Sequence, residues 1–263
     1  MIRRNERALA ESRTFSVRPV PVLRPLGWLA RGWRDLTRCP LPGLAHGLAA
    51  TLFGVLLVLV AHRHFWLLTG AFSGFLLVAP IVATGLYAVS RELARGNRPT
   101  LATALRVWKP DDSRLIVFGL LLGLAGTGWV MTSAALITGF AGAKVDNPVD
   151  FLRVVVLAPK GWLFEAWLVL GGVLAAPVFA SSVVAIPLML DRQVSVMAAV
   201  FTSWRVVMEH PAPLALWAAL IMVMTLLGMV TVIGLVLVVP WLAHASWHAY
   251  KDMVNTTGLT PNP

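Results

Sequence analysis

The 263-residue chain is too apolar and too poor in charge for a soluble domain: hydrophobic residues make up 58% of it and charged residues 13%, against about 25% charged residues in a typical soluble protein. A water-soluble fold of this length cannot bury so much apolar surface, so lipid must cover part of it. The formal net charge is +10, but no nucleic-acid-binding motif accompanies it, which leaves anionic lipid headgroups as the expected partner and nucleic acid as an excluded one.

The N-terminal part of the chain is polar and basic. Residues 1–25 contain three prolines and many arginines, and they predict a flexible basic cytoplasmic tail. Residues 26–38 interleave two tryptophans with three arginines, and this predicts a short interfacial helix: Trp28, Arg31, Trp33, Arg34 and Arg38. Tryptophan prefers the headgroup layer and arginine pairs with phosphates there. An ordinary solvated helix before the first span is the alternative.

Residues 39–252 form the predicted membrane domain. Its apolar blocks match the length of about 20 residues that one span requires, and they predict six spans near 43–61, 65–88, 115–140, 162–190, 212–229 and 232–250. The last apolar block is too long for one span, so it is expected to fold back between Gly228 and Gly234. Residues 253–263 are a short cytoplasmic tail. The fold class is therefore an all-α polytopic transmembrane helix bundle of about six spans, with short interfacial amphipathic helices.

Basic residues are distributed unevenly about these spans. With six spans, 18 arginines and lysines fall on the side that holds both termini, and 4 fall on the other side. Because short cytoplasmic loops carry an excess of Lys and Arg, both termini are expected to be cytoplasmic.

The sequence shows no constellation of residues that carries chemistry. It has no P-loop, nucleophile elbow or HExxH motif, so we expect no enzyme and name no catalytic residue. His244 and His248 are four apart on a predicted helix and share a face, a spacing that can bind a metal or a haem. No carboxylate or cysteine of matching spacing supports such a site, so we expect no metal-binding residue, no cofactor-binding residue and no cofactor.

Two segments resemble a known family. They are GWRDLTRCPLPGLAHGL from Gly32 to Leu48 and APIVATGLYAVSRELARGNRPTLATAL from Ala79 to Leu105. They resemble the DUF2189 family of predicted bacterial integral membrane proteins, and the resemblance extends over nearly the whole chain beyond residue 25. The matching positions are Trp33, Asp35, Pro40, Gly47, Pro80, Gly85, Tyr87, Ser90, Arg91 and Gly96. The resemblance implies a multi-pass protein of the bacterial cytoplasmic (inner) membrane.

Three functions remain open at this point. The first is a non-catalytic scaffold, assembly or envelope-maintenance factor, since the spans carry almost no ionisable residues and ion-coupled transport requires them. The second is a passive transporter or channel for a small or lipid-like solute, because prolines that break spans can open a cavity. The third is a haem-associated respiratory partner, which rests on His244 and His248 alone. The expected partners are membrane lipids, with a homo-oligomer or another membrane protein left open.

Overall fold

The computed structural model describes residues 2–61, 81–107, 113–158, 161–231 and 233–257. Almost all of them are helical, and the strands are limited to β1 (Ser16–Val17) and β2 (Val254–Asn255), which pair antiparallel. The predicted all-α class is therefore confirmed. The chain divides into two compact units, of which unit 1 is Met1–Leu52, Pro80–Phe118 and Phe179–Pro263, and unit 2 is Phe53–Ala79 and Gly119–Val178.

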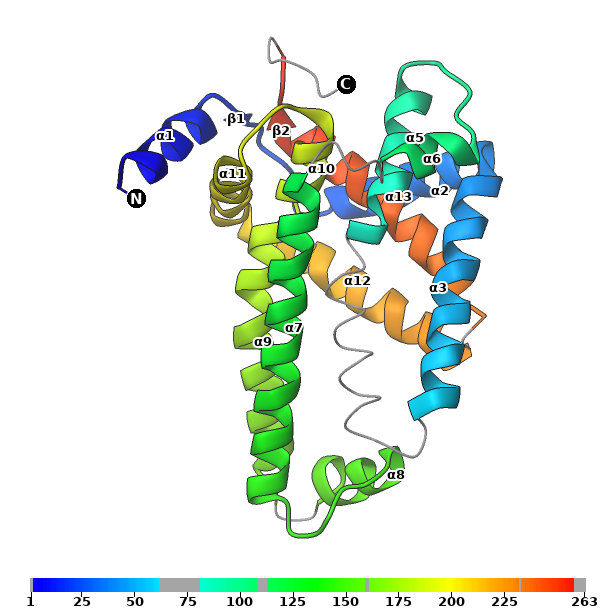
Figure 1. Cartoon of the computed structure of the whole chain (residues 1–263), viewed down its shortest axis with the longest axis vertical. Coiled ribbons are helices and arrows are strands. Elements are labelled where there is room, and N and C mark those ends of the chain that lie inside the picture. Colours follow the sequence, from blue (N-terminus) through cyan, green and yellow to red (C-terminus); the bar gives the residue numbers. More distant parts are fainter. Residues whose placement is uncertain (1, 62–80, 108–112, 159–160, 232, 258–263) are drawn as a thin grey trace. The chain divides into compact units, whose positions relative to one another are not determined.

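Unit 1 is built around two helices from opposite ends of the chain, α2 (Arg24–Arg38) and α13 (Leu235–Met253), which pack against each other (Figure 1). Large aromatic side chains fill the space around this pair, and Trp28, Trp247 and Tyr250 are almost completely buried. The other helices of unit 1 are α1 (Ile2–Arg13), the first part of α3 (Pro40–Ala61), α5 (Thr84–Ala94), α6 (Leu101–Arg106), α10 (Ala185–Asp191), α11 (Val196–Glu209) and α12 (Pro211–Thr231).

The expectation of a flexible tail over residues 1–25 is wrong. Residues 2–13 form α1, which packs against α11, and residues 16–17 form β1. Glu11 accepts hydrogen bonds from the backbone N–H and the hydroxyl of Ser195, at 3.0 and 2.6 Å, and the Phe15 side chain is buried. The composition indicated disorder, but these long-range contacts order the segment. In the C-terminal tail, residues 254–255 form β2, and residues 258–263 lie outside the described residues.

Unit 2 contains most of α7 (Ser113–Phe140) and of α9 (Leu163–Ser182), joined through α8 (Pro148–Phe151) and the π-helix η1 (Leu152–Val156). The two long helices contact each other through the Trp167 indole, which donates a 2.6 Å hydrogen bond to Ser133. A small apolar cluster lies at their connected ends, formed by Ile137, Val145, Val155 and Leu163.

The described residues contain three helical segments that are long and apolar enough to cross a membrane: Ser113–Phe140, Leu163–Asp191 and Pro211–Thr231. A fourth follows if α2 and the first part of α3 are one broken span, bent by 104°. The number of about six spans is therefore not confirmed. The expected span at 65–88 lies mostly outside the described residues, and α13, in the expected span at 232–250, is not one of these candidates.

The pairing of β1 with β2 constrains the topology. Ser16 lies opposite Asn255, and Val17 lies opposite Val254. Two strands that share hydrogen bonds lie on the same side of a membrane, because paired backbone groups cannot be separated by a bilayer. Residues 17 and 254 therefore lie on the same side of a membrane that the chain crosses.

Candidate functional site

The C-terminal end of α13 binds α2 through one carboxylate. Asp252 accepts a hydrogen bond from the Arg24 Nε at 2.6 Å, from the Arg31 guanidinium at 3.0 Å and from the Trp28 indole at 2.9 Å. Burial alone would raise the pKa of Asp252, but the hydrogen bonds from Arg31, Arg24 and Trp28 outweigh it and lower this pKa to about 2. Asp252 therefore stays ionised, and it pairs with two arginines of α2.

A second carboxylate, Asp35 on the buried face of α2, connects α2 to α5 and α13. The Ser90 hydroxyl on α5 donates to Asp35 at 2.7 Å, and Nε2 of His248 on α13 lies 2.8 Å from the same oxygen. The Ser90 oxygen also lies 2.7 Å from Nδ1 of His244. All these groups except His248 are buried. Their hydrogen bonds connect α2, α5 and α13 in the interior of unit 1.

The direction of these hydrogen bonds follows from Asp35. An ionised carboxylate only accepts, so both Ser90 and His248 must donate to it. Because the Ser90 proton points to Asp35, the Nδ1 of His244 must donate to the Ser90 oxygen, and His244 Nε2 is left with a lone pair. That atom is buried and has no hydrogen-bond partner among the described residues. A serine activated as a nucleophile gives its proton to a histidine, whereas the Ser90 proton is held by Asp35.

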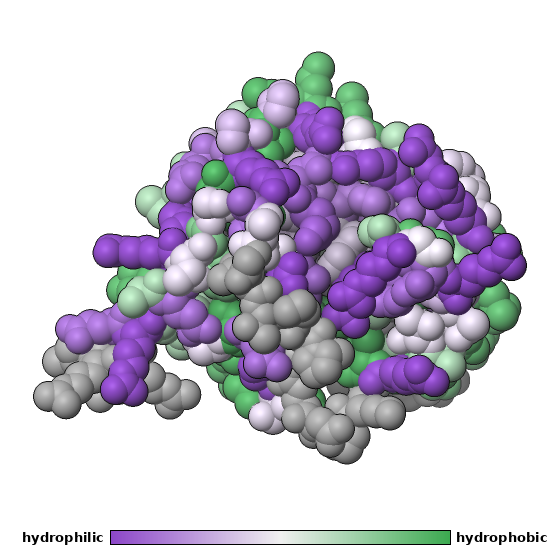
Figure 2. Space-filling view, turned by 90° about the horizontal axis from the view of Figure 1, so that it is seen from above, coloured by the Kyte–Doolittle hydropathy of each residue, from purple (hydrophilic) through white to green (hydrophobic). Residues whose placement is uncertain are grey.

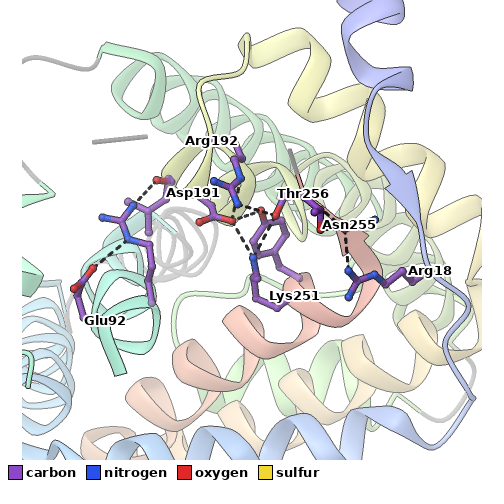
Figure 3. A network of polar contacts seen from close by, with 11 residues as sticks. Arg18, Glu92, Asp191, Arg192, Lys251, Asn255 and Thr256 are labelled. Atoms are coloured by element: carbon purple, nitrogen blue, oxygen red, sulfur yellow. Dashed lines mark hydrogen bonds and ion pairs between the residues drawn. The ribbon is translucent and has the colours of Figure 1, made fainter. Parts of the chain in front are cut away.

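A third carboxylate, Asp191, ends α10 and binds the last turn of α13 (Figure 3). The Tyr250 hydroxyl donates to it at 2.8 Å and the Lys251 ammonium at 3.2 Å. Arg192 extends this network, because its guanidinium donates to the Thr256 hydroxyl at 3.1 Å. The Asp191 side chain is only 5% exposed, so this network fixes α10 and β2 to α13.

Most of the described carboxylates of unit 1 thus pair with groups of unit 1 itself, whereas many of its arginines are exposed. Glu92 accepts from Arg95 and Asn97, and Glu209 lies 3.8 Å from Arg205. Arg34 and Arg38 on α2 are exposed, and neither has an ion pair with a carboxylate of the described residues. Viewed from the end where α1, α10 and β2 lie, hydrophilic side chains cover most of the surface (Figure 2). The exposed arginines of α2, Arg34 and Arg38, are called the basic platform below.

Several sequence interpretations change at this point. Trp28 and Arg31 were expected to face lipid, and this is wrong: Trp28 has no exposed surface and Arg31 is bound to Asp252. The spacing of tryptophan and arginine suits a lipid surface and a packed helix equally well, and a distant partner decides between them. Trp33, by contrast, is exposed.

His244 and His248 do not converge on a common ligand position, although they share a face of α13. His244 is bound through Ser90 and His248 through Asp35. The described residues contain no cluster of three or more histidine, cysteine or acidic side chains that could hold a metal ion. Sequence reasoning missed Asp35, Asp191 and Asp252 as the residues that organise unit 1. The available signal was their scarcity, since the chain has only 12 acidic residues and these three lie on or beside apolar helical stretches.

Comparison with known proteins gives one match, between residues 67–191 and the family model described as "Predicted integral membrane protein (DUF2189)". The resemblance to DUF2189 is confirmed over this part of the chain. The DUF2189 region includes Ser90 and Asp191, whereas Asp35, His244 and Asp252 lie outside it. The matched region is thus shorter than the resemblance read from the sequence, and the segment from Gly32 to Leu48 falls before it. The match and the long apolar helices identify an integral membrane protein. No match was found among the curated proteins or the solved structures.

Proposed function

We propose that this chain is a non-catalytic membrane protein of the scaffold, assembly or envelope-maintenance class, which holds its basic platform against the anionic lipid of the cytoplasmic face of a bacterial inner membrane. The observation that carries this proposal is the division of charge in unit 1. Asp35, Asp191 and Asp252 bind partners within unit 1, whereas the exposed Arg34 and Arg38 have no carboxylate partner among the described residues. Such a surface attracts anionic headgroups, and both termini lie on this cytoplasmic side in the proposal.

The orientation of α2 supports the lipid contact. The axis of α2 makes an angle of 104° with the first part of α3, which is 14° from a right angle. If α3 crosses the bilayer along its normal, α2 lies nearly in the plane of the membrane. Leu23, just before α2, and Leu26 and Trp33 of α2 are 67%, 52% and 42% exposed, and the Trp33 ring also packs on Trp241 of α13 with the ring centroids 4.9 Å apart.

The exposed residues of α2 also have the spacing of an interfacial helix. Leu26, Ala30, Trp33 and Thr37 recur every three or four residues, so they form one stripe along the helix. Arg34 and Arg38 flank this stripe. An apolar stripe bordered by arginine is the pattern of a helix that lies in the headgroup layer. The opposite side of α2 packs on α13, so the helix has an inner and an outer apolar face.

The buried polar networks suit a rigid support better than a site for chemistry. Asp35, Asp191 and Asp252 each join helices that are distant in the sequence, and each binds two or more partners. Buried carboxylates that each bind several partners hold the helices around them in one arrangement. This supports a protein whose role is to present a surface.

The proposal can be tested with the full chain reconstituted in vesicles of phosphatidylcholine alone or of phosphatidylcholine with phosphatidylglycerol. Each basic residue near an anionic surface contributes about 1 kcal/mol, so Arg34→Gln with Arg38→Gln should weaken docking of α2 by about 2 kcal/mol, or roughly 30-fold. The readout is hydrogen–deuterium exchange of residues 24–38. The double variant should lose the protection that anionic lipid adds, and salt should reduce this protection in the wild type.

The matched control is Arg34→Lys with Arg38→Lys, which keeps both charges and should keep most of the protection. The lipid proposal fails if phosphatidylglycerol adds no protection to the wild type, or if the Gln and Lys variants behave alike. A solute-flux assay on the same vesicles addresses the alternative of passive transport. Solute entry through the wild-type protein would overturn the scaffold assignment in favour of a transporter.

A further inference from the structure

The connection between α7 and α9 is much longer than a helical hairpin requires. Helix–helix connections commonly take about 2–8 residues, whereas 22 residues separate Phe140 from Leu163. The part of this connection that the structure describes is folded. Asn147 caps α8 by accepting from the N–H groups of Val149 and Asp150, both at 2.9 Å, and the π-helix η1 follows directly.

This segment packs back onto the ends of the two long helices. Val145 and Val155 are buried against Ile137 of α7 and Leu163 of α9. The segment, residues 141–158, is called the cap below. It has a polar part, where Lys144 pairs with Asp146 at 2.9 Å, and a mostly apolar part, formed by α8 and η1, whose charged residues are Asp150 and the exposed Arg153.

The apolar part of the cap is exposed on one side. Val149 is 53%, Leu152 47% and Leu157 64% exposed. Val149 and Leu152 are three positions apart, and Leu152 and Leu157 are five apart. Because the segment changes from α to π geometry between them, these spacings keep the three side chains on one side. Exposure of apolar surface to water is unfavourable, so another surface is expected to cover these side chains.

The ends of α7 and α9 indicate what covers it. The 20 residues of α9 give a length of about 30 Å at 1.5 Å per residue, which matches the hydrocarbon core of a bilayer. Phe140 and Trp162 lie at these ends with their rings 5.3 Å apart, edge to face. Exposed aromatic residues at the end of a span mark the headgroup layer, and Trp162 is 57% exposed.

We infer that the cap lies in the lipid headgroup layer, with Val149, Leu152 and Leu157 inserted toward the acyl chains and Lys144 and Asp146 toward water. In this arrangement lipid covers the exposed apolar side chains of the cap as well as those of α7 and α9. The cap is then a second interfacial element, which anchors the connected ends of α7 and α9. This inference concerns unit 2 alone and does not rest on the proposed role of the basic platform.

The test uses nitroxide spin labels on the full chain in phosphatidylcholine vesicles, in a Cys39→Ser background. Leu157→Cys and Val149→Cys report on the apolar side of the cap, and Lys144→Cys and Asp146→Cys are the matched polar controls. Oxygen concentrates in lipid and a nickel chelate concentrates in water, so the ratio of their collision rates with the label reports depth. This ratio should be several-fold higher at the two apolar positions than at the two polar ones.

Two results would overturn the inference. Equal ratios at all four positions would place the cap in water. Low access of both reagents to the apolar positions would show that protein covers them, for instance a second copy of the chain. All four positions are on the exposed surface, so these substitutions remove no buried contact, and retention of the fold can be checked by the helical circular dichroism signal.

Discussion

Asp252→Asn should weaken the attachment of α2 to α13, because it removes the charge that Arg24 and Arg31 share. The pKa of Asp252 is lowered from 3.8 to about 2, and one pKa unit corresponds to about 1.4 kcal/mol. The side chain is only 16% exposed, but Arg24 is 48% exposed, so water screens part of the interaction. We therefore expect a loss of about 2 kcal/mol, which is roughly a 30-fold change in the local opening equilibrium.

The assay is hydrogen–deuterium exchange of residues 24–38 in detergent micelles, where no anionic lipid contributes. The matched control is Asp146→Asn, which removes the exposed pair with Lys144. That pair is 84% and 56% exposed, and such surface pairs contribute about 0–1 kcal/mol. Exchange should accelerate in α2 for Asp252→Asn and remain near the wild-type rate there for the control. Equal exchange of α2 in the two variants would refute the assignment of Asp252 as an attachment point.

The same shift predicts a pH dependence. Because the folded pKa of Asp252 lies below its unfolded value, the carboxylate contributes stability above the unfolded pKa of about 3.9, and this contribution is lost as the pH falls toward 2. The difference in α2 exchange between wild type and Asp252→Asn should be constant from about pH 7 to pH 5 and shrink below about pH 4. A difference that already disappears between pH 7 and pH 5 would point to another titrating group.

Three further predictions follow from the packing and the topology. Gly32→Ala should separate α2 from α13, because a Cβ there would lie 2.6 Å from the backbone nitrogen of Ala245 on the facing helix. Gly27→Ala on the same helix would bring a Cβ only to within 4.0 Å of the Arg24 side chain, and it should be neutral or stabilising by about 0.5–1 kcal/mol. Thermal unfolding in detergent distinguishes the two variants. Ser90→Ala should cost about 1–3 kcal/mol because it leaves a buried imidazole and a buried carboxylate short of a partner. Ser12→Ala, which breaks a side-chain hydrogen bond to Leu9 within α1, should cost less in the same measurement. Reporter fusions at the C-terminus and within the 141–158 segment should give opposite sides of the membrane, and a periplasmic C-terminus would contradict the proposed orientation.

The class of the protein was predictable because hydropathy is a local property. The apolar blocks at 115–140 and 162–190 correspond to candidate spans that end within two residues of them, and the composition alone excluded a soluble fold. The block at 232–250 shows the limit of this reasoning. Its helix, α13, extends to Met253, and its His244 and Trp247 are buried among the other helices of unit 1. The hydrophobicity of this block therefore reflects protein packing as well as any contact with lipid.

The buried networks were not predictable from one sequence because their members are far apart in it. Arg31 and Asp252 are separated by 221 positions, and Ser90 and His244 by 154. Trp28 and Trp33 each follow a glycine in the same helix, yet Trp28 is fully buried and Trp33 is 42% exposed. Only the position of the partner helix distinguishes them.

The same networks explain why a chain with 12 acidic residues can present so basic a surface. Burying an ion pair is expensive, and an apolar replacement is often as stable, so stability alone gives little reason to keep Asp35, Asp191 and Asp252 inside unit 1. Their positions do have a consequence for the surface. A carboxylate held between helices cannot neutralise a distant exposed arginine, because it is paired with partners of its own, such as the partly exposed Arg31 and Lys251. The arginines that remain outside, Arg34 and Arg38 among them, then meet no opposing charge from the described part of their own chain. If the field of this surface has a function, replacing Asp35 by a neutral residue should leave it almost unchanged, whereas placing a carboxylate beside Arg34, as in Thr37→Glu, should weaken binding to phosphatidylglycerol vesicles by about the 1 kcal/mol that one charge contributes.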